Sequence, residues 1–367
     1  MVAGNLHPLV KLNLVLLLFF LIFGGLYLAS DFLIPLAFAG IFAMLMSPLS
    51  AKLEGIGFNK ALASFVCILL LVLVFTGIGT LLSTQIASFT EDLPQIEQEI
   101  NKQLISLQGF FHETFGISPE EQQKIVKEGS SSESGGLSSI ILSFIDSSTG
   151  AMANALLVLV YMFLLLYYRS RFPIFILKVV SEDQEERAQH VIQESSQVAQ
   201  KYLIGRGILI VILAVLYSAG LTIAGLDNAL FLSAIAALLT IIPYVGNIIG
   251  FSLLMLMALA QGEGSQMYLS ILIIFSIVQL IESYVLEPFV VGAEVDIHPF
   301  FTVVIIIVGE QIWGVAGMIL AIPMLAIVKI IFSHIDFMSP YAYLIGDTRD
   351  KKRSRASDKI KNWFSHT

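Results

Sequence analysis

The chain is short of charge. Only 13% of its 367 residues are Asp, Glu, Lys or Arg, against 56% hydrophobic residues, whereas a soluble domain carries about 25% charged residues. Its mean hydropathy is correspondingly high, at +0.85. Cysteine is almost absent as well, and the single Cys67 lies inside an apolar run. One cysteine excludes an intrachain disulfide and any site built on paired cysteines.

The sequence also lacks the motifs of the common enzyme and motor classes. It contains no Walker A loop, no HExxH and no GxSxG, so it has no recognisable machinery for ATP hydrolysis or for hydrolysis within a membrane. His298 and His334 stand alone, and basic residues do not alternate with aromatic ones. We therefore expect a protein that is not an enzyme, with no catalytic residues, no metal site, no cofactor and no nucleic-acid partner.

What the sequence does contain is long apolar runs, and a run of about 20 residues can cross a bilayer as a helix. Helices are predicted over residues 9–29, 32–50, 61–83, 151–168, 207–225 and 267–287, and the first is interpreted as a retained span. Two further runs, 229–260 and 299–332, exceed one crossing and contain Pro and Gly. Both are predicted to be broken, and either to cross the membrane or to re-enter it. The fold class is an all-α integral membrane protein with about eight transmembrane segments.

Lys and Arg set the orientation of such a chain. Six of them lie in 169–206 and eight from 329 onward, whereas 84–149 holds three basic and ten acidic residues. The basic segments and both termini are therefore expected in the cytoplasm. The expected parts are membrane helices 1–3 (1–83), an extracytoplasmic polar helical loop (84–149), a fourth membrane helix with a cytoplasmic amphipathic helix (150–206), a membrane transport region with broken helices (207–332) and a cytoplasmic basic tail (333–367).

The amphipathic helix is predicted to begin at Ser181, as an N-cap with Gln184 three residues later in a capping box. Its apolar positions, Ala188, Val191, Ile192, Val198, Ala199 and Tyr202, recur at helical spacing. We expect this face to pack on the protein, because the opposite face is not basic enough to favour the membrane surface.

Between residues 207 and 328 there is no Lys or Arg, but there are seven acids. Four of these acids fall in predicted connections and are interpreted as exposed loop charges: Asp227, Glu263, Glu294 and Asp296. The others, Glu282, Glu287 and Glu310, lie within or at the ends of apolar segments. A charge at the bilayer centre costs about 2.5–3.5 kcal/mol. A proton, water, a bound cation or a distant base such as Arg206 would have to compensate each charge. They are candidate transport residues, and a helix–helix hydrogen bond is the alternative role.

Around Glu282 the spacing indicates a polar stripe. Ser276, Gln279, Glu282 and Ser283 fall on one helical face. Such a stripe in a membrane helix faces a cavity or another helix.

The breaks in the long runs suggest transport. Pro243 removes a backbone N–H and is expected to free the carbonyl of Leu239, and secondary transporters bind substrate or ions at such breaks. We expect Pro243–Gly250 at membrane depth, close to Glu282 or Glu310, with a simple packing kink as the alternative. The predicted substrate or ion pathway consists of Pro243, Tyr244, Gly246, Asn247, Gly250, Gln279, Glu282, Glu287, Glu310, Gly314, Gly317 and Pro323. The likeness of ALLTIIP (237–243) to GMILAIP (317–323) suggests an internal repeat.

Five stretches carry a family resemblance: YLIGRG (202–207), IPYVGNIIG (242–250), QLIESYVLEPFVVG (279–292), IHPF (297–300) and GVAGMILAIPMLAIVKII (314–331). In this order and spacing they resemble the AI-2E (autoinducer-2 exporter) family of bacterial membrane proteins, formerly described as uncharacterised permeases. The resemblance implies eight membrane segments, a homo-oligomer, in this family a pentamer, in the bacterial inner membrane, and export of a small molecule.

Autoinducer-2, a quorum-sensing signal, is the substrate that the resemblance implies, although some relatives are described as Na⁺(Li⁺)/H⁺ antiporters. The chain departs from the family at VGAEVDIHP, which is acidic through Glu294 and Asp296 where relatives often carry basic residues. This departure argues against an anionic substrate and favours cation coupling.

The sequence thus predicts a secondary transporter that exports a small polar molecule, with H⁺ or Na⁺ as the coupling ion if export is coupled. The alternatives are a Na⁺(Li⁺)/H⁺ antiporter and a non-transporting membrane scaffold that presents its outer loop and tail to partners. The expected partners are the lipid bilayer, a small-molecule or monovalent cation substrate, and further copies of the chain.

Overall fold

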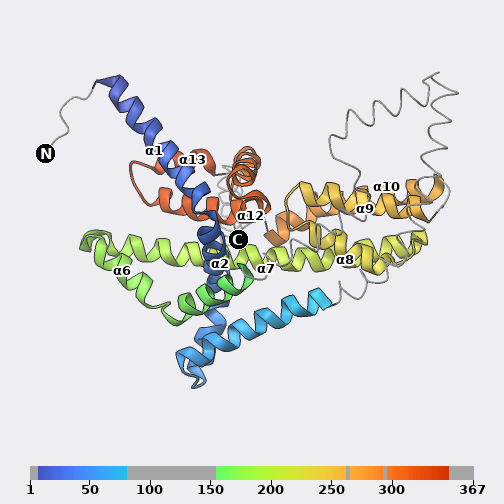
Figure 1. Ribbon diagram of the computed structural model, residues 1–367, viewed down its shortest axis with the longest axis horizontal. Helices are drawn as coiled ribbons and strands as arrows, with labels where there is room; N and C mark the ends of the chain where they lie inside the picture. The colour runs from blue at the N-terminus through green and yellow to red at the C-terminus, as the bar shows by residue number, and fades with distance from the viewer. Residues whose placement is uncertain (1–6, 81–153, 262–264, 292–295, 347–367) are drawn as a thin grey trace, which may run out of the picture. The chain divides into compact units, whose positions relative to one another are not determined.

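The computed structural model describes residues 7–80, 154–261, 265–291 and 296–346. Within these ranges every regular element is a helix, and the only extended pairing is an isolated bridge between Ile297 and Gly346 (Figure 1). The prediction of an all-α chain is confirmed. The predicted outer loop, 84–149, lies outside the described residues, as does the basic tail from residue 347 onward.

The chain divides into two compact units. Unit 1 is formed by residues 1–68, 154–205 and 291–367, and unit 2 by residues 69–153 and 206–290. The helices of unit 1 are α1 (Pro8–Leu28), α2 (Ser30–Gly55), the helix Asn154–Tyr167, α6 (Arg171–Val179), the short 3₁₀ helix η1 (Glu182–Gln184), α12 (Pro299–Ser333) and α13 (Ser339–Ile345). Unit 2 contains α8 (Ala229–Leu239), α9 (Val245–Ala260), α10 (Ser265–Ile281) and the π-helix η2 (Glu282–Val291). The helices Lys60–Thr80 and α7 (Glu185–Ala224) contribute to both units.

By length and composition, five helices in the described part of the chain could cross a membrane: Ser30–Gly55, Lys60–Thr80, Glu182–Ala224, Gln266–Glu287 and Pro299–Ser333. A sixth span results if Asn154–Tyr167 and Arg171–Val179, which meet at a bend of 67°, are counted together. The chain is a multi-pass membrane protein. The expected total of about eight segments stays a prediction, because the described residues provide five or six candidate spans.

The predicted amphipathic helix and the span after it form one helix, α7, of 40 residues. The first part of α7 packs on the protein as expected, since Val198 joins Ala326 and Ile330 of α12 in a buried cluster. The predicted capping box is wrong. The Ser181 side chain makes no capping hydrogen bond, and a 3₁₀ turn begins after it.

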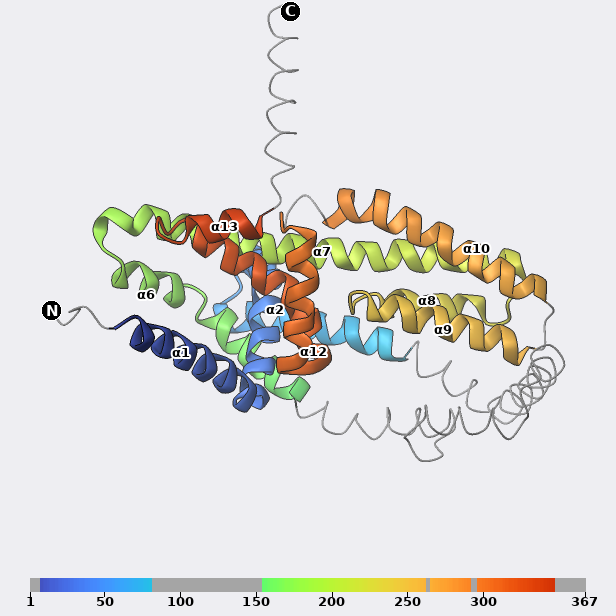
Figure 2. The ribbon, with the colours of Figure 1, turned by 90° about the horizontal axis from the view of Figure 1, so that it is seen from above.

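The first long apolar run, 229–260, folds into a helical hairpin of α8 and α9, which lie side by side (Figure 2). At its tip Gly246 touches the Leu239 carbonyl group, so that a Cβ there would collide with it. At its open end the Gln261 side chain binds the backbone N–H of Asp227 at 3.2 Å. Neither helix, at 11 and 16 residues, reaches the length of about 20 residues that a crossing needs.

The second long run, α12, is broken as predicted, at Gly314, whose φ of 58° and ψ of −139° are not helical. The chain reverses there, because Gly309 and Gly317 touch through their backbones and a Cβ on Gly309 would lie 3.4 Å from the Ala321 Cβ. In a straight helix Gly309 and Ala321 would be about 18 Å apart. The first half is also tied to α1, since the Trp313 indole donates to the Leu26 carbonyl at 2.9 Å.

The proposed internal repeat is wrong. ALLTIIP ends α8 and precedes the turn at Pro243, whereas GMILAIP follows the break at Gly314 and lies in the second half of α12. The two sequences therefore occupy opposite sides of their hairpins.

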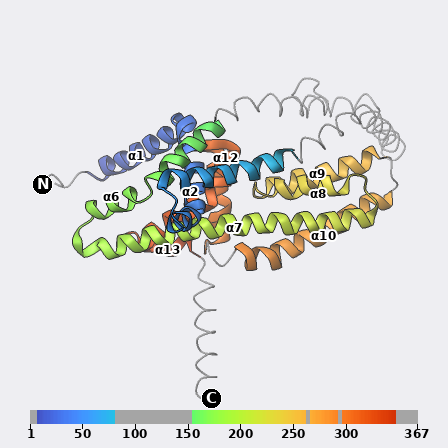
Figure 3. The ribbon, with the colours of Figure 1, turned by 90° about the horizontal axis from the view of Figure 1, so that it is seen from below.

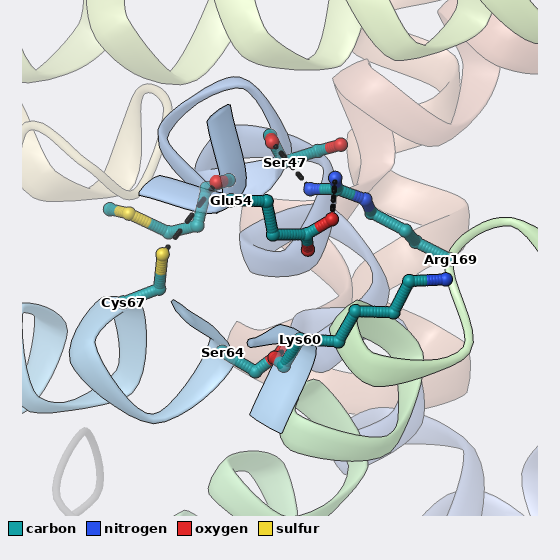
Figure 4. A network of polar contacts seen from close by, with 7 residues as sticks. Ser47, Glu54, Lys60, Ser64, Cys67 and Arg169 are labelled. Carbon is teal, nitrogen blue, oxygen red and sulfur yellow. Dashed lines mark hydrogen bonds and ion pairs between the residues drawn. The ribbon is translucent and has the colours of Figure 1, made fainter. Parts of the chain in front are cut away.

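In unit 1 a proline within α2 is compensated from two neighbouring segments. Pro48 cannot donate to the carbonyl of Met44, four residues before it, and the Gln200 amide donates to that carbonyl instead at 2.8 Å. Arg169 lies between Ser47 and Glu54 (Figure 4), donating to the Ser47 carbonyl at 3.1 Å and pairing with the Glu54 carboxylate at 3.0 Å. These contacts bind α2 to α7 and to the end of the Asn154–Tyr167 helix.

Candidate substrate and ion site

The candidate site of unit 2 is centred on Glu282, where α10 changes into the π-helix η2. The side chain is buried, with an exposed fraction of 4% for the residue. The Gln279 amide donates to its carboxylate at 3.1 Å and lies 3.4 Å from the Ser283 hydroxyl. A π-helical turn within an α-helix is frequent at functional sites, because it changes the direction of the side chains that follow. Glu282, which the sequence selected as a candidate transport residue, is therefore a buried and hydrogen-bonded polar residue.

α7 supplies the second side of the site. The Arg206 guanidinium and the Tyr217 hydroxyl both lie within electrostatic range of the Glu282 carboxylate. Arg206 is the distant base that the sequence offered to compensate a buried acid. Tyr217 is fully buried. The sequence analysis did not select it, because one phenol within an apolar span is no sign of a site.

Close packing of α7 against α10 holds these groups in place (Figure 3). Gly220 is needed for this contact, because a Cβ there would lie 2.5 Å from Cγ2 of Ile274. Next to it the Tyr217 ring stacks on Phe275 with ring centroids 5.4 Å apart. The Tyr217 hydroxyl is thus directed by an aromatic pair on facing helices, and its position depends on the α7–α10 interface.

Several buried polar atoms of unit 2 have no hydrogen-bond partner within the described part of the chain. They are Arg206 Nε, Tyr217 Oη, Gln279 Oε1 and Asn247 Oδ1. Leaving such an atom unpaired costs about 1–3 kcal/mol, so protein interiors contain few of them. Two donors and two acceptors on α7, α9 and α10 are therefore left for water or a small polar ligand to bind.

The tip of the α8–α9 hairpin was expected to lie close to Glu282 or Glu310, and this expectation is met only in part. Tyr244 has a φ of 62° and is 56% exposed, and its hydroxyl lies within electrostatic range of Glu287 on η2. The tip is therefore near the π-helix that begins with Glu282. The predicted free carbonyl at Leu239 is wrong, because the Ile242 N–H donates to it at 3.0 Å. Gly250 packs on Ala236, where a Cβ would be 3.4 Å from the Ala236 Cα.

The remaining predicted pathway residues belong to unit 1. Glu310 is exposed on α12 and accepts a hydrogen bond from the Gln311 amide at 2.6 Å. Gly314 forms the break, Gly317 the close backbone contact, and Pro323 lies buried in the second half, away from the break. The pathway role of these four residues, like that of the other eight predicted ones, stays a prediction. Of the predicted stripe, Gln279, Glu282 and Ser283 are joined by hydrogen bonds, and Ser276 takes no part in these bonds.

Asp296, interpreted as an exposed loop charge, lies in the connection before α12 with its side chain 40% exposed, but it is paired. Lys329 binds both its carboxylate and its backbone carbonyl, and holds it at a φ of 39°. This ion pair neutralises the acid, so Asp296 gives no support to cation coupling. Its neighbour Glu294 lies outside the described residues.

Metal-ligating groups do not gather in the described ranges: no three His, Cys, Asp or Glu side chains in them could hold one ion. The Glu282 site contains a single buried carboxylate with an arginine close by. Such a donor set suits a proton, a neutral polar molecule or a weakly held monovalent ion better than a divalent metal.

The chain is a multi-pass helical membrane protein, and its two helical hairpins and its buried polar cluster between helices are features that secondary transporters share. The sequence profile described as AI-2E family transporter matches residues 14–336, and the chain belongs to this family. YueF of Bacillus subtilis, named as a candidate transport protein, is 26% identical over 83% of this chain and 85% of its own. YhhT of Escherichia coli K12, also so named, is 23% identical over 95% of this chain and 97% of its own. The resemblance drawn from the motifs is confirmed, and a membrane transport role is supported.

Proposed function

We propose that the protein is a secondary transporter that exports a small polar molecule of the autoinducer-2 type across the bacterial inner membrane. In this proposal Glu282 binds and releases the ion whose movement drives export. Both termini face the cytoplasm, and the chain works as a homo-oligomer. Family membership supports transport; the substrate and the export direction are those that the resemblance implies, and the coupling is inferred from the Glu282 site.

The observation that carries the proposal is the burial of Glu282 among incompletely paired polar groups. A carboxylate with 4% of its residue exposed is costly to keep charged unless it is compensated. Arg206 and the Gln279 amide supply part of this compensation. A carboxylate with few hydrogen-bonding partners can bind a proton or a cation in their place and release it again. A coupled transporter requires such reversible binding.

A proton is the better-supported coupling ion. A bound Na⁺ would lie close to the positive charge of Arg206, which disfavours it, whereas protonation of Glu282 places no second cation in the site. Protonation and release at one carboxylate would weaken and restore its attraction to Arg206. Movement of α7 relative to α10 could thereby follow the protonation state.

A second candidate, the Na⁺(Li⁺)/H⁺ antiporter, is favoured by the oxygen atoms at the same place. The Glu282 carboxylate, the Ser283 hydroxyl and the unpaired Gln279 Oε1 are hard oxygen donors of the kind that Na⁺ binds. The two candidates therefore share Glu282 and differ in what crosses the membrane.

Flux measurements in proteoliposomes test both candidates. Vesicles containing the full chain and a pH-sensitive dye are given Na⁺, Li⁺ or K⁺ in one arm, and are loaded with autoinducer-2 under an imposed pH gradient in the other. The proposal expects pH-driven efflux of the signal and no cation-dependent pH change, with efflux reduced at least tenfold by Glu282→Gln. A Na⁺- or Li⁺-dependent pH change that Glu282→Gln abolishes would establish the antiporter instead.

The matched control is Glu186→Gln, which removes an equal charge from an exposed position on α7. It is expected to transport as the unmodified protein does. If a monodisperse, folded sample shows neither flux, the scaffold alternative gains and the transporter proposal is rejected. Native mass spectrometry of the same sample measures the expected pentamer.

A further inference from the structure

Unit 1 contains a pocket that is separate from the Glu282 site. It has a volume of about 370 Å³ and is lined by Tyr168, Arg171, Phe172 and Phe175. These residues surround the 67° bend between the Asn154–Tyr167 helix and α6 (Figure 1). The pocket thus lies where a membrane helix ends and a short amphipathic helix begins.

The wall of the pocket combines one cation with aromatic rings. The Arg171 guanidinium lies over the Tyr168 ring at 4.9 Å from its centroid, a cation–π geometry that orients the side chain. No ion pair of Arg171 occurs among the described residues. The guanidinium is therefore fixed in direction, and its N–H groups remain available for a phosphate, which arginine binds with two parallel hydrogen bonds.

The rest of α6 has the pattern of a helix at the membrane interface. Phe172 is 51% exposed and Phe175 66% exposed, so large apolar side chains face outward. Lys178 lies seven residues, or two turns, after Arg171 and shares its face. A narrow basic face on an otherwise apolar helix is typical of helices that lie in the headgroup region.

We propose that Tyr168, Arg171, Phe172 and Phe175 form a binding site for an anionic phospholipid. Arg171 binds the phosphate, Lys178 contributes a second positive charge near the headgroup, and the two phenylalanine rings contact the glycerol backbone and the upper acyl chains. Charge complementarity selects this occupant. The segment 169–178 around the pocket carries three basic residues and no acid, and anionic lipids are concentrated at cytoplasmic membrane surfaces, where basic segments are expected.

Native mass spectrometry of the full chain in mild detergent tests the site. The protein is titrated with phosphatidylglycerol or with phosphatidylcholine of identical acyl chains, and the first bound lipid is counted. We expect tighter binding of phosphatidylglycerol and a loss of about fivefold on Arg171→Gln, which is the effect of one basic side chain near a charged headgroup. Phosphatidylcholine binding should be unchanged by this substitution.

Two further variants separate a specific site from general charge. Arg187→Gln removes an equal charge from an exposed arginine on α7, which pairs with Asp336 at 3.4 Å, and it should leave phosphatidylglycerol binding unaltered. Phe175→Ala should weaken both lipids. If Arg171→Gln does not yield folded protein, Arg171→Lys tests the same contact and should retain the preference for phosphatidylglycerol but reduce its affinity.

Three results would overturn the proposal. The first is equal binding of the two lipids by the unmodified protein. The second is an equal loss from Arg171→Gln and Arg187→Gln, which would indicate charge attraction without a site. The third is crosslinking between two copies of the chain through α6 that phosphatidylglycerol does not reduce, because a second copy would then occupy the site. Glycerol 1-phosphate should not compete, because the phenylalanine contacts require a lipid.

Discussion

The backbones of Gly309 and Gly317 touch across the break in α12. A Cβ on Gly309 would lie 2.6 Å from the Gly317 carbonyl oxygen, and a Cβ on Gly317 would collide with the carbonyl group of Gly309. Two halves of one helix can approach this closely only where neither residue has a side chain. The hairpin therefore depends on the pair and not on Gly314 alone.

We predict that Gly317→Ala destabilises the protein, because the added methyl group forces the two halves of α12 apart. Overpacking of this kind costs about 1–3 kcal/mol. Thermal unfolding in detergent, followed by size-exclusion fluorescence, should show a fall in melting temperature. Gly40→Ala is the control, because a Cβ at Gly40 of α2 would meet nothing within 4 Å. An equal fall in the melting temperatures of both variants would show that the close contact between Gly309 and Gly317 is not the cause.

A second prediction concerns the carbonyl of Met44, which Pro48 leaves without its helical donor and Gln200 satisfies at 2.8 Å. Gln200→Leu should lower stability, because an unsatisfied buried carbonyl costs about 1–3 kcal/mol. Pro48→Ala restores an N–H four residues later in α2. The loss caused by Gln200→Leu should therefore be smaller in the Pro48→Ala background.

This double-mutant cycle is read from four melting temperatures. A coupling energy near zero would show that Gln200 stabilises the protein by another route, for example through its 3.3 Å contact with Ser196. Ser196→Ala measures that contribution by itself.

Much of the fold followed from hydrophobic periodicity and length. The runs at 229–260 and 299–332 were too long for one crossing, and their Pro and Gly residues marked a break in each. What could not be predicted was which groups meet after the chain reverses. The contact between Gly309 and Gly317 needs the geometry of the break, and the satisfied Leu239 carbonyl follows from a turn that no local rule fixed.

The site was predictable in so far as charge is costly in an apolar segment. That argument selected Glu282, and spacing placed Gln279 beside it. Tyr217 was missed because one phenol in an apolar span is also what simple packing produces. The ion pair of Asp296 was missed because its partner, Lys329, lies 33 residues away, and such pairing is set by tertiary structure.

A third prediction addresses Arg169 (Figure 4). Its two bonds, to Glu54 and to the Ser47 carbonyl, use separate nitrogen atoms, and the side chains of the ion pair are only 23% and 21% exposed. Lysine has a single ammonium group and cannot reproduce this fork. Arg169→Lys should therefore lower the melting temperature, by about 2–4 °C for each kcal/mol lost. Glu54→Gln removes the charge of the ion pair alone. If Arg169→Lys and Glu54→Gln showed no coupling energy in the double mutant, the ion pair would not contribute to stability.

The last prediction separates the Glu282 site from the helix that carries it. Gln279→Leu keeps the size and apolar packing of α10 but removes the amide that donates to the Glu282 carboxylate at 3.1 Å. A hydrogen bond to a charged group contributes about 1.5–3 kcal/mol, so transport in proteoliposomes should fall at least tenfold and its pH profile should shift. Ser276→Ala alters an exposed position on the same helix and should leave both unchanged. If Gln279→Leu lowered the melting temperature but transported normally with an unaltered pH profile, Gln279 would be a packing residue and the site would have to lie elsewhere.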